Sequence, residues 1–96
     1  MKGAIGSVEI FAHRGEDPVR RLTFVVGEPK LASTEARWTC RVALANLHRP
    51  VEITGRDSVG VLGEALARGR EWLFALEADG FELFRDREGR DPYKID

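Results

Sequence analysis

The sequence holds one cysteine, one methionine, one tyrosine and two histidines among 96 residues. A single cysteine, Cys40, excludes a disulfide within the chain, and we expect no structural zinc site because such sites need paired Cys or His ligands. Neither sign of charge is in excess, since fifteen basic and sixteen acidic residues leave a net charge of −1 at pH 7. Such a balance creates no overall field that would attract a nucleic-acid backbone or an anionic membrane.

Long hydrophobic runs are also missing. The first apolar residues soon meet Glu9, and no segment has the length and apolar character of a signal peptide or a membrane span. Together with the lone thiol, this favours a cytoplasmic protein. The length and the proportions of apolar residues (43%) and charged residues (32%) are typical of one folded domain that covers residues 1–96.

Four segments alternate between apolar and polar residues, as half-buried strands do: 7–13, 19–26, 36–44 and 51–54. The clearest is 36–44, where Trp38, Cys40 and Val42 share the side that we expect to face the core. Turn-forming residues separate the segments at 14–18, 27–29 and 46–50. Short connections of this kind predict an antiparallel meander of four strands.

After Gly55 the apolar period changes from two to 3.6, which predicts a helix over 58–79. Asp57 and Ser58 suit its N-terminal cap, and Gly80 suits a left-handed residue at its end. A helical wheel predicts an apolar stripe that lies on the sheet and consists of Val59, Leu62, Ala65, Leu66, Gly69, Trp72, Leu73 and Leu76. Within this stripe, Gly69 would let the helix backbone approach the sheet closely.

The segment after Gly80 allows two interpretations. Its apolar run 81–84 fits either a fifth strand or a segment folded over the end of the helix, and 85–96 fits either a charged tail or a small hairpin. The predicted fold class is therefore α+β: a four-stranded antiparallel meander, with the fifth C-terminal strand left open, and one long helix packed on one face.

One apolar patch is a candidate interface. Phe74 lies on the polar side of the predicted helix and could join Phe81, Leu83 and Phe84 in a surface that needs cover. That cover could come from the chain's own tail or from a second copy in a homodimer.

The outward face of the predicted sheet offers a weaker candidate. Phe11, Arg21, Arg37 and Arg41 would share it, which is a basic face of the kind that binds single-stranded nucleic acid. Such sheets stack bases on two or three aromatic residues and only one is available here, so cross-strand Arg–Glu pairs on a hydrated face are the favoured interpretation.

No catalytic, cofactor-binding or metal-binding residue is predicted. A thiolate–imidazole pair of Cys40 with His13 or His48 needs an exposed sulfur, whereas the alternation points Cys40 inward. Phosphate-binding glycine loops are missing as well, since Gly60 and Gly63 fall inside the predicted helix.

The order of three motifs resembles a family of small bacterial proteins that is known only as a domain of unknown function. These motifs are Trp38-Thr39-Cys40, the stretch from Ile53 through Gly55-Arg56-Asp57-Ser58, and Leu62 with Ala65-Leu66. The likeness covers about half of the chain, and Gly60 and Val61 stand where the family pattern has Gln and Ala. It implies a bacterial protein and brings no activity, ligand or catalytic residue.

These observations predict a non-enzymatic protein-interaction module whose partner is a protein, with a homodimer through a sheet edge or the C-terminal patch as one form. Two alternatives stay open. One is a single-stranded nucleic-acid binder that uses the arginine-bearing face. The other is a small enzyme or ligand-binding subunit whose site forms on assembly from Asp57, Ser58, His13 or His48.

Overall fold

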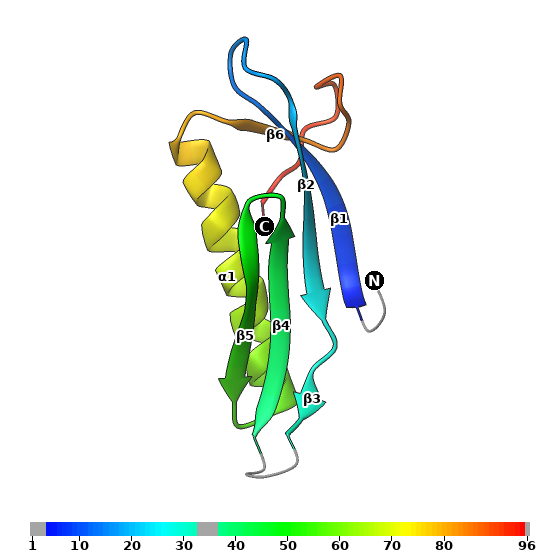
Figure 1. The fold of residues 1–96 in the computed structure, drawn as a ribbon, viewed down its shortest axis with the longest axis vertical. Helices are drawn as coiled ribbons and strands as arrows, with labels where there is room; N and C mark the ends of the chain where they lie inside the picture. The colour runs from blue at the N-terminus through cyan, green and yellow to red at the C-terminus, as the bar shows by residue number, and fades with distance from the viewer. Residues whose placement is uncertain (1–3, 33–36, 96) are drawn as a thin grey trace.

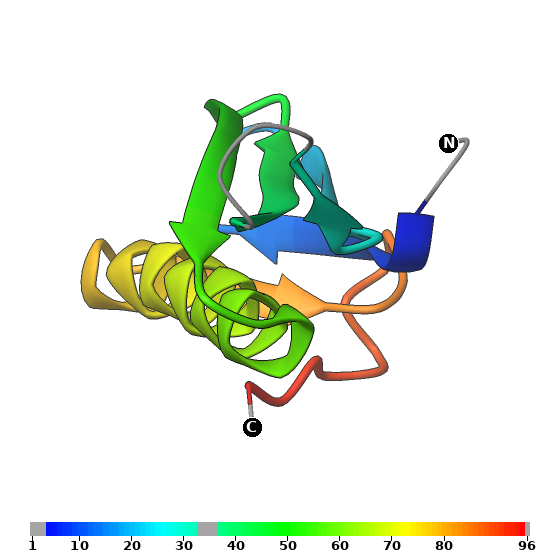
Figure 2. The same ribbon diagram turned by 90° about the horizontal axis from the view of Figure 1, so that it is seen from below.

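The computed structural model describes residues 4–32 and 37–95 and shows an α+β architecture, as predicted (Figure 1). One helix runs along one face of an antiparallel sheet, and the view from below separates the two layers (Figure 2). The elements in chain order are β1 (Ala4–His13), β2 (Arg20–Gly27), β3 (Lys30–Leu31), β4 (Trp38–Ala45), β5 (His48–Gly55), α1 (Ser58–Ala78) and β6 (Glu82–Phe84).

The sheet contains the predicted meander, because β1 pairs with β2, β2 with β4, and β4 with β5, each time antiparallel. The two-residue strand β3 was missed from the sequence. It pairs with β4 on the same side as β2 does. The run after the helix is a strand, β6, which pairs antiparallel with β1. The helix therefore connects strands at opposite sides of the sheet.

The reversal after β4 is tighter than predicted. The loop expected over 46–50 is a turn at Asn46 and Leu47, and β5 already begins at His48. Asn46 adopts a left-handed φ of 74°, which Asn tolerates better than most residues, and its side chain donates to the Arg21 carbonyl at 2.9 Å. The prediction placed Pro50 in the loop, but this proline lies inside β5. It is tolerated there because β5 is at a sheet edge, where the missing N–H costs little. Ala36, the predicted start of β4, lies outside the described residues.

Both ends of α1 are set by local chemistry that the sequence indicated. Asp57 is the N-cap, and its Oδ1 accepts a hydrogen bond from the Gly60 N–H at 2.6 Å. Gly80 has a φ of 94° just after the helix, and the next residue, Phe81, donates its N–H back to the Leu76 carbonyl at 3.0 Å. The chain is thus turned from the helix directly into β6.

The face of α1 that meets the sheet differs from the predicted stripe. The buried helix residues are Val61, Ala65, Gly69, Leu73 and Leu76. Val59 and Leu66, both predicted to face the sheet, are 79% and 37% exposed. The buried residues advance mainly in steps of four, a row that is inclined to the helix axis, whereas a wheel averages all turns into one direction. The prediction was therefore wrong for the first turns, where Val61 replaces Val59.

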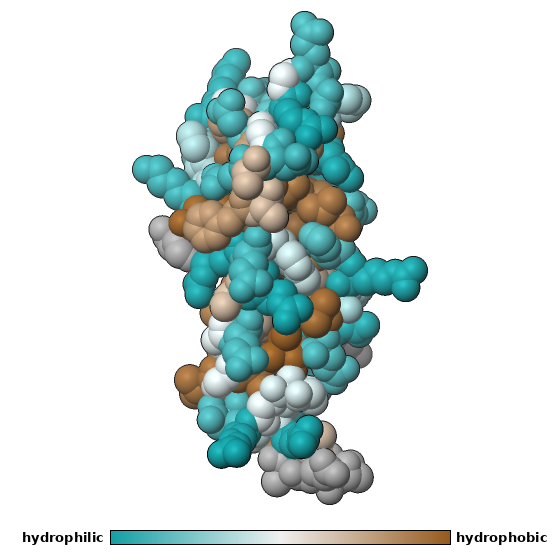
Figure 3. Space-filling model, turned by 90° about the vertical axis from the view of Figure 1, so that its left-hand side faces the viewer, coloured by the Kyte–Doolittle hydropathy of each residue, from teal (hydrophilic) through white to brown (hydrophobic). Residues whose placement is uncertain are grey.

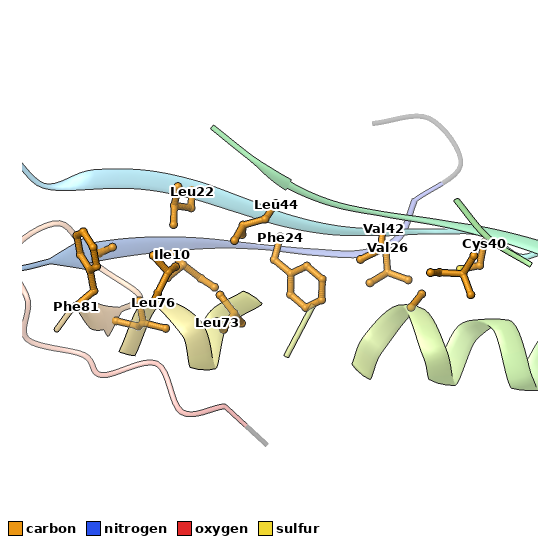
Figure 4. Packing of buried hydrophobic residues seen from close by; sticks show 14 of the residues in the cluster. Ile10, Leu22, Phe24, Val26, Cys40, Val42, Leu44, Leu73, Leu76 and Phe81 are labelled. Atoms are coloured by element: carbon orange, nitrogen blue, oxygen red, sulfur yellow. The ribbon is translucent and has the colours of Figure 1, made fainter. Parts of the chain in front are cut away.

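The centre of the helix–sheet contact is the pair Gly69 and Phe24. A Cβ atom at Gly69 would lie 2.1 Å from Cζ and 2.3 Å from Cε1 of Phe24, so the aromatic ring occupies the space of the absent side chain. Figure 4 shows the Phe24 ring extending from β2 toward the helix. The predicted close approach at Gly69 is confirmed, and its cause is this ring.

The rest of the core lies on the same face of the sheet. Cys40, predicted to point inward, is only 1% exposed, and Trp38 packs against the core as a partly buried residue. Fully buried side chains continue in both directions from Phe24 (Figure 4). They include Ile10, Leu22, Val42, Leu44, Val61 and Leu73.

Two helix glycines make a matched pair for testing this contact. We expect Gly69→Ala to destabilise the fold by about 2 kcal/mol or more, because the Phe24 ring must shift, although alanine is the better helix former. Gly63→Ala should stabilise the fold by about 0.5–1 kcal/mol, because nothing lies within 4 Å of its Cβ position. Denaturant unfolding of both variants measures the two effects, and equal signs would contradict the structure.

Candidate functional site

Three of the four residues of the predicted C-terminal interface, Phe74, Leu83 and Phe84, line one shallow groove, and Phe81 does not. Phe81 and Leu83 are 5% and 3% exposed and belong to the chain's own core. Phe84 is half-buried on the other face of β6, and Phe74 is 52% exposed on α1. Of the four, only Phe74 is largely open to solvent.

The C-terminal segment 85–95, here named the tail, covers the outer edge of β6. The Tyr93 N–H donates to the Leu83 carbonyl at 2.9 Å, and the Arg85 N–H donates to the Asp91 carbonyl at 2.7 Å. Phe84 and Pro92 form an isolated antiparallel bridge. Of the two interpretations of this segment, the structure shows the hairpin-like one, because its two ends are joined by backbone hydrogen bonds.

Asp86 organises the turn at the tip of the tail. Its carboxylate accepts the Asp91 N–H at 2.9 Å and the Arg90 N–H at 2.9 and 3.1 Å. These hydrogen bonds, the one from Asp91 first, lower the pKa of the Asp86 carboxyl below its usual range. Gly89 completes the turn with a left-handed φ of 75°.

An aromatic cluster joins the tail to β1. The His13 ring meets the Phe84 ring edge-on, with centroids 4.8 Å apart and planes at 79°. His13 Nε2 is buried without a hydrogen-bond partner, and a Cβ at Gly89 would lie 3.6 Å from it. The tail therefore covers this end of β1 as well as β6.

A shallow groove of about 400 Å³ separates α1 from the tail. Phe74 and Glu77 line it from the helix, and Glu82, Leu83 and Phe84 line it from β6. On the far side are Pro92, Tyr93, Lys94 and Ile95, of which Tyr93 and Ile95 also pack against the core. The apolar cover that the C-terminal run needed is thus supplied largely by the chain itself.

The basic outer face is largely engaged in contacts within the chain. Arg21 forms an ion pair with Glu9, and Arg41 lies opposite Glu52 in the pairing of β4 with β5. The guanidinium of Arg87 sits 5.3 Å from the centroid of the Phe11 ring. Arg37 is exposed just before β4. Phe11 and Arg21 lie directly opposite each other in the pairing of β1 with β2, but Phe11 is not an open stacking surface.

The candidate polar residues for a catalytic site lie far apart. Asp57 caps the start of α1, whereas His48 stacks on Trp72 with ring centroids 4.7 Å apart, about 20 Å further along the helix. His13 lies at the tail. Cys40 is buried, its Sγ contacts the Gly27 carbonyl at 3.3 Å, and burial raises the pKa of its thiol. The structure brings none of these groups into a common site.

Strand edges remain as a candidate surface, and they differ in protection. The outer edge of β5 carries Pro50, the charged residues Arg49 and Glu52, and a register shift against β4 between Val42 and Leu44. These features are typical of edges that resist pairing. The neighbouring face of the molecule presents apolar surface only in separate areas, divided by hydrophilic side chains (Figure 3).

The edge of β1 is different. Its pairing with β2 spans residues 4–12, but β6 pairs only with residues 11–13. Residues 6–10, here named the open β1 edge, have a regular register with β2 and, among the described residues, no strand on their other side. In Figure 1 this stretch is the lower part of β1, at the right-hand border of the sheet. Its one charged residue, Glu9, is already paired with Arg21.

Comparison of the chain with protein-family models, curated proteins and solved structures found no match. The resemblance to the bacterial domain family therefore stays a prediction. Within residues 4–32 and 37–95, no group of three or more His, Cys, Asp or Glu side chains is placed to hold a metal ion. No helix in the same part of the chain is long and apolar enough to cross a membrane.

The lowered pKa of Asp86 predicts how the tip of the tail responds to acid. Because the folded-state pKa is depressed, the stabilisation is complete above the ordinary aspartate range of about 3.9 and is lost as the pH falls through the lower value. In an NMR titration, the amide signals of Arg90 and Asp91 should shift with a midpoint below about 3.9. A midpoint at or above that value would contradict the geometry, and Asp86→Asn should remove the transition.

Proposed function

We propose that this chain is a non-enzymatic protein-interaction module that binds its partner by adding an extended segment to the open β1 edge. The observation that carries this proposal is the one-sided pairing of residues 6–10, which leaves backbone N–H and C=O groups without a strand partner. Strand addition uses such groups for affinity and uses pockets for alternate side chains for specificity.

Side chains at this edge suit an extended partner. Val8 is only partly buried although it packs against the core, and Ile5, just before the open edge, is 54% exposed. A strand added along this edge would place its side chains beside those of β1 on both faces of the sheet, because successive side chains alternate between the helix side and the outer side. The backbone therefore offers hydrogen bonds, and Val8 offers apolar contact.

The two alternative functions receive less support. Single-stranded nucleic acid would have to displace Arg87 from Phe11 and compete with Glu9 for Arg21. An enzyme would need Asp57, His48 and His13 to come from separate regions of the fold. A cytoplasmic location also belongs to the proposal, and it is supported by the one cysteine, which is free and buried.

A short peptide of alternating Thr and Val residues serves as a probe for strand addition. Titrated into the dilute, isotope-labelled chain, it should shift the amide signals of residues 6–10 most strongly. The variant Val8→Lys places a charge in the middle of the open β1 edge, and it should abolish these shifts of the amide signals. Val51→Lys is the matched control, because Val51 is likewise a partly buried residue of an edge strand, β5.

Loss of peptide binding in Val8→Lys, with binding kept in Val51→Lys, would support the β1 edge. Shifts that map to β5, to the groove between α1 and the tail, or to the outer face would overturn the proposal. Circular dichroism of both variants verifies that α1 is intact.

A further inference from the structure

We infer that the partner segment at the open β1 edge is the C-terminal end of a polypeptide, added parallel to β1 with its free carboxylate beside the guanidinium groups of Arg85 and Arg87. This inference rests on the proposed function and adds the chemical class of the partner and the direction in which it binds. Two features of the edge carry it, namely the point at which β6 closes it and the positive charge at that point.

The open β1 edge is closed at one end by β6. This strand lies on the same side of β1 and already pairs with Phe11, Ala12 and His13, so an added strand can pair only as far as Ile10. A segment that continued beyond Ile10 would have to leave the sheet, because β6 occupies the line ahead of it. A chain terminus stops there without a turn, which favours the end of a polypeptide as the occupant.

Two arginines, here named the arginine pair, flank this closed end. Arg85 comes directly after Phe84, which pairs with Phe11, so its backbone lies beside the closed end. Its guanidinium is 5.1 Å from the centroid of the Tyr93 ring, which packs against the core on the helix side of the sheet. The guanidinium of Arg87 is 5.3 Å from the centroid of the Phe11 ring, on the outer side. Positive charge is therefore present on both faces of the sheet where the open edge ends.

The arginine pair has no carboxylate partner of its own. Neither guanidinium takes part in an ion pair within the described part of the chain, and both residues are exposed. Asp86 lies between them in the sequence, but its carboxylate accepts the N–H groups of Arg90 and Asp91. An added carboxylate could therefore form charge-assisted hydrogen bonds with the pair.

Charge also determines the direction of the added strand. Parallel addition places the partner's C-terminal carboxylate at the closed end, whereas antiparallel addition places an N-terminal amine there, beside two like charges. The lower stability of a parallel ladder is slight for each residue, whereas charge-assisted hydrogen bonds are about twice as strong as neutral ones. Glu9, the one acidic residue of the open β1 edge, is paired with Arg21 and opposes this arrangement little.

The edge further predicts which side chains the partner carries. Val8 and Ile10 face the helix side, as does Gly6, whose Cβ position has nothing within 4 Å. Residues that lie side by side in neighbouring strands share a face. We therefore expect an apolar residue at the partner's C-terminus, beside Ile10, and another two residues before it, beside Val8.

Two forms of one peptide test the role of the terminal carboxylate. An acetylated peptide of alternating Thr and Val that ends in Val is titrated into the isotope-labelled chain, once as the free acid and once as the C-terminal amide. The free acid should bind about tenfold more tightly at low salt, and this preference should fall as the salt concentration rises. Equal affinity of the two forms would overturn the inference.

The double variant Arg85→Gln/Arg87→Gln tests the arginine pair. It should lose the preference for the free acid and should bind the amide form as the wild type does, because the backbone of the edge is unchanged. Arg49→Gln/Arg56→Gln is the matched control, since it removes the same charge from exposed positions in and just after β5. An equal loss of preference in both double variants would indicate an effect of net charge alone and would contradict the assignment to the arginine pair.

A nitroxide group in place of the acetyl group tests the direction of the peptide. In the parallel arrangement it lies at the far end of the edge from β6, so it should broaden the amide signals of Gly6 and Ser7 more than those of Ile10 and Phe11. The reverse order would show antiparallel addition and would overturn the inference.

The two proposals can fail separately. Binding of both peptide forms at residues 6–10 with equal affinity would keep the interaction module and remove the recognition of a C-terminal carboxylate. A chain that binds neither form at this edge would remove both.

Discussion

The position of α1 depends on the ring of Phe24 occupying the place of a side chain at Gly69. No residue with a Cβ fits there without displacing the ring, so the contact fixes both the distance between helix and sheet and the rotation of the helix. A second glycine acts in a similar way at the start of the helix. A Cβ at Gly55 would lie 2.8 Å from Cγ1 of Val61, the first buried residue of α1. The helix therefore contacts the sheet closely at two points. At one of them Phe24 of the sheet fills the space beside Gly69, and at the other Val61 of the helix fills the space beside Gly55.

The path of the helix has consequences for the sheet edges. Because α1 connects β5 to β6 at opposite sides of the sheet, the chain returns to β1 only after the helix has ended. Gly80 turns it there, and β6 has three residues before the tail turns away at Asp86. A strand of three residues cannot cover the ten residues of β1. The open β1 edge is thus a direct result of the length of the helix and the shortness of β6.

Much of the fold was predictable because it depends on local chemistry. Alternation placed Cys40 inside, the change of period at Gly55 located the helix, and Asp57 and Gly80 marked its ends. The wheel failed at Val59 and Leu66 because the helix contacts the sheet along an inclined row, which depends on the twist of the sheet and not on the helix alone.

The candidate site was less predictable, because an open edge is a property of the whole sheet. Nothing in residues 6–10 distinguishes them from a strand with two neighbours, since the difference arises from the point at which β6 stops. The run 81–84 was equally ambiguous in the sequence. Phe81 and Leu83 are core residues, and the tail covers the outer edge of β6, but Phe74 on the helix stays 52% exposed.

The central contact is tested most directly by a double-mutant cycle on the free energy of unfolding, with Gly69→Ala combined with Phe24→Leu. In the Phe24→Leu background the ring is gone, so the added methyl group at residue 69 should cost little or should even stabilise the helix. A coupling of about 1–3 kcal/mol between the two sites is the predicted result. If Gly69→Ala destabilises both backgrounds equally, the ring does not determine the position of the helix, and the account is wrong.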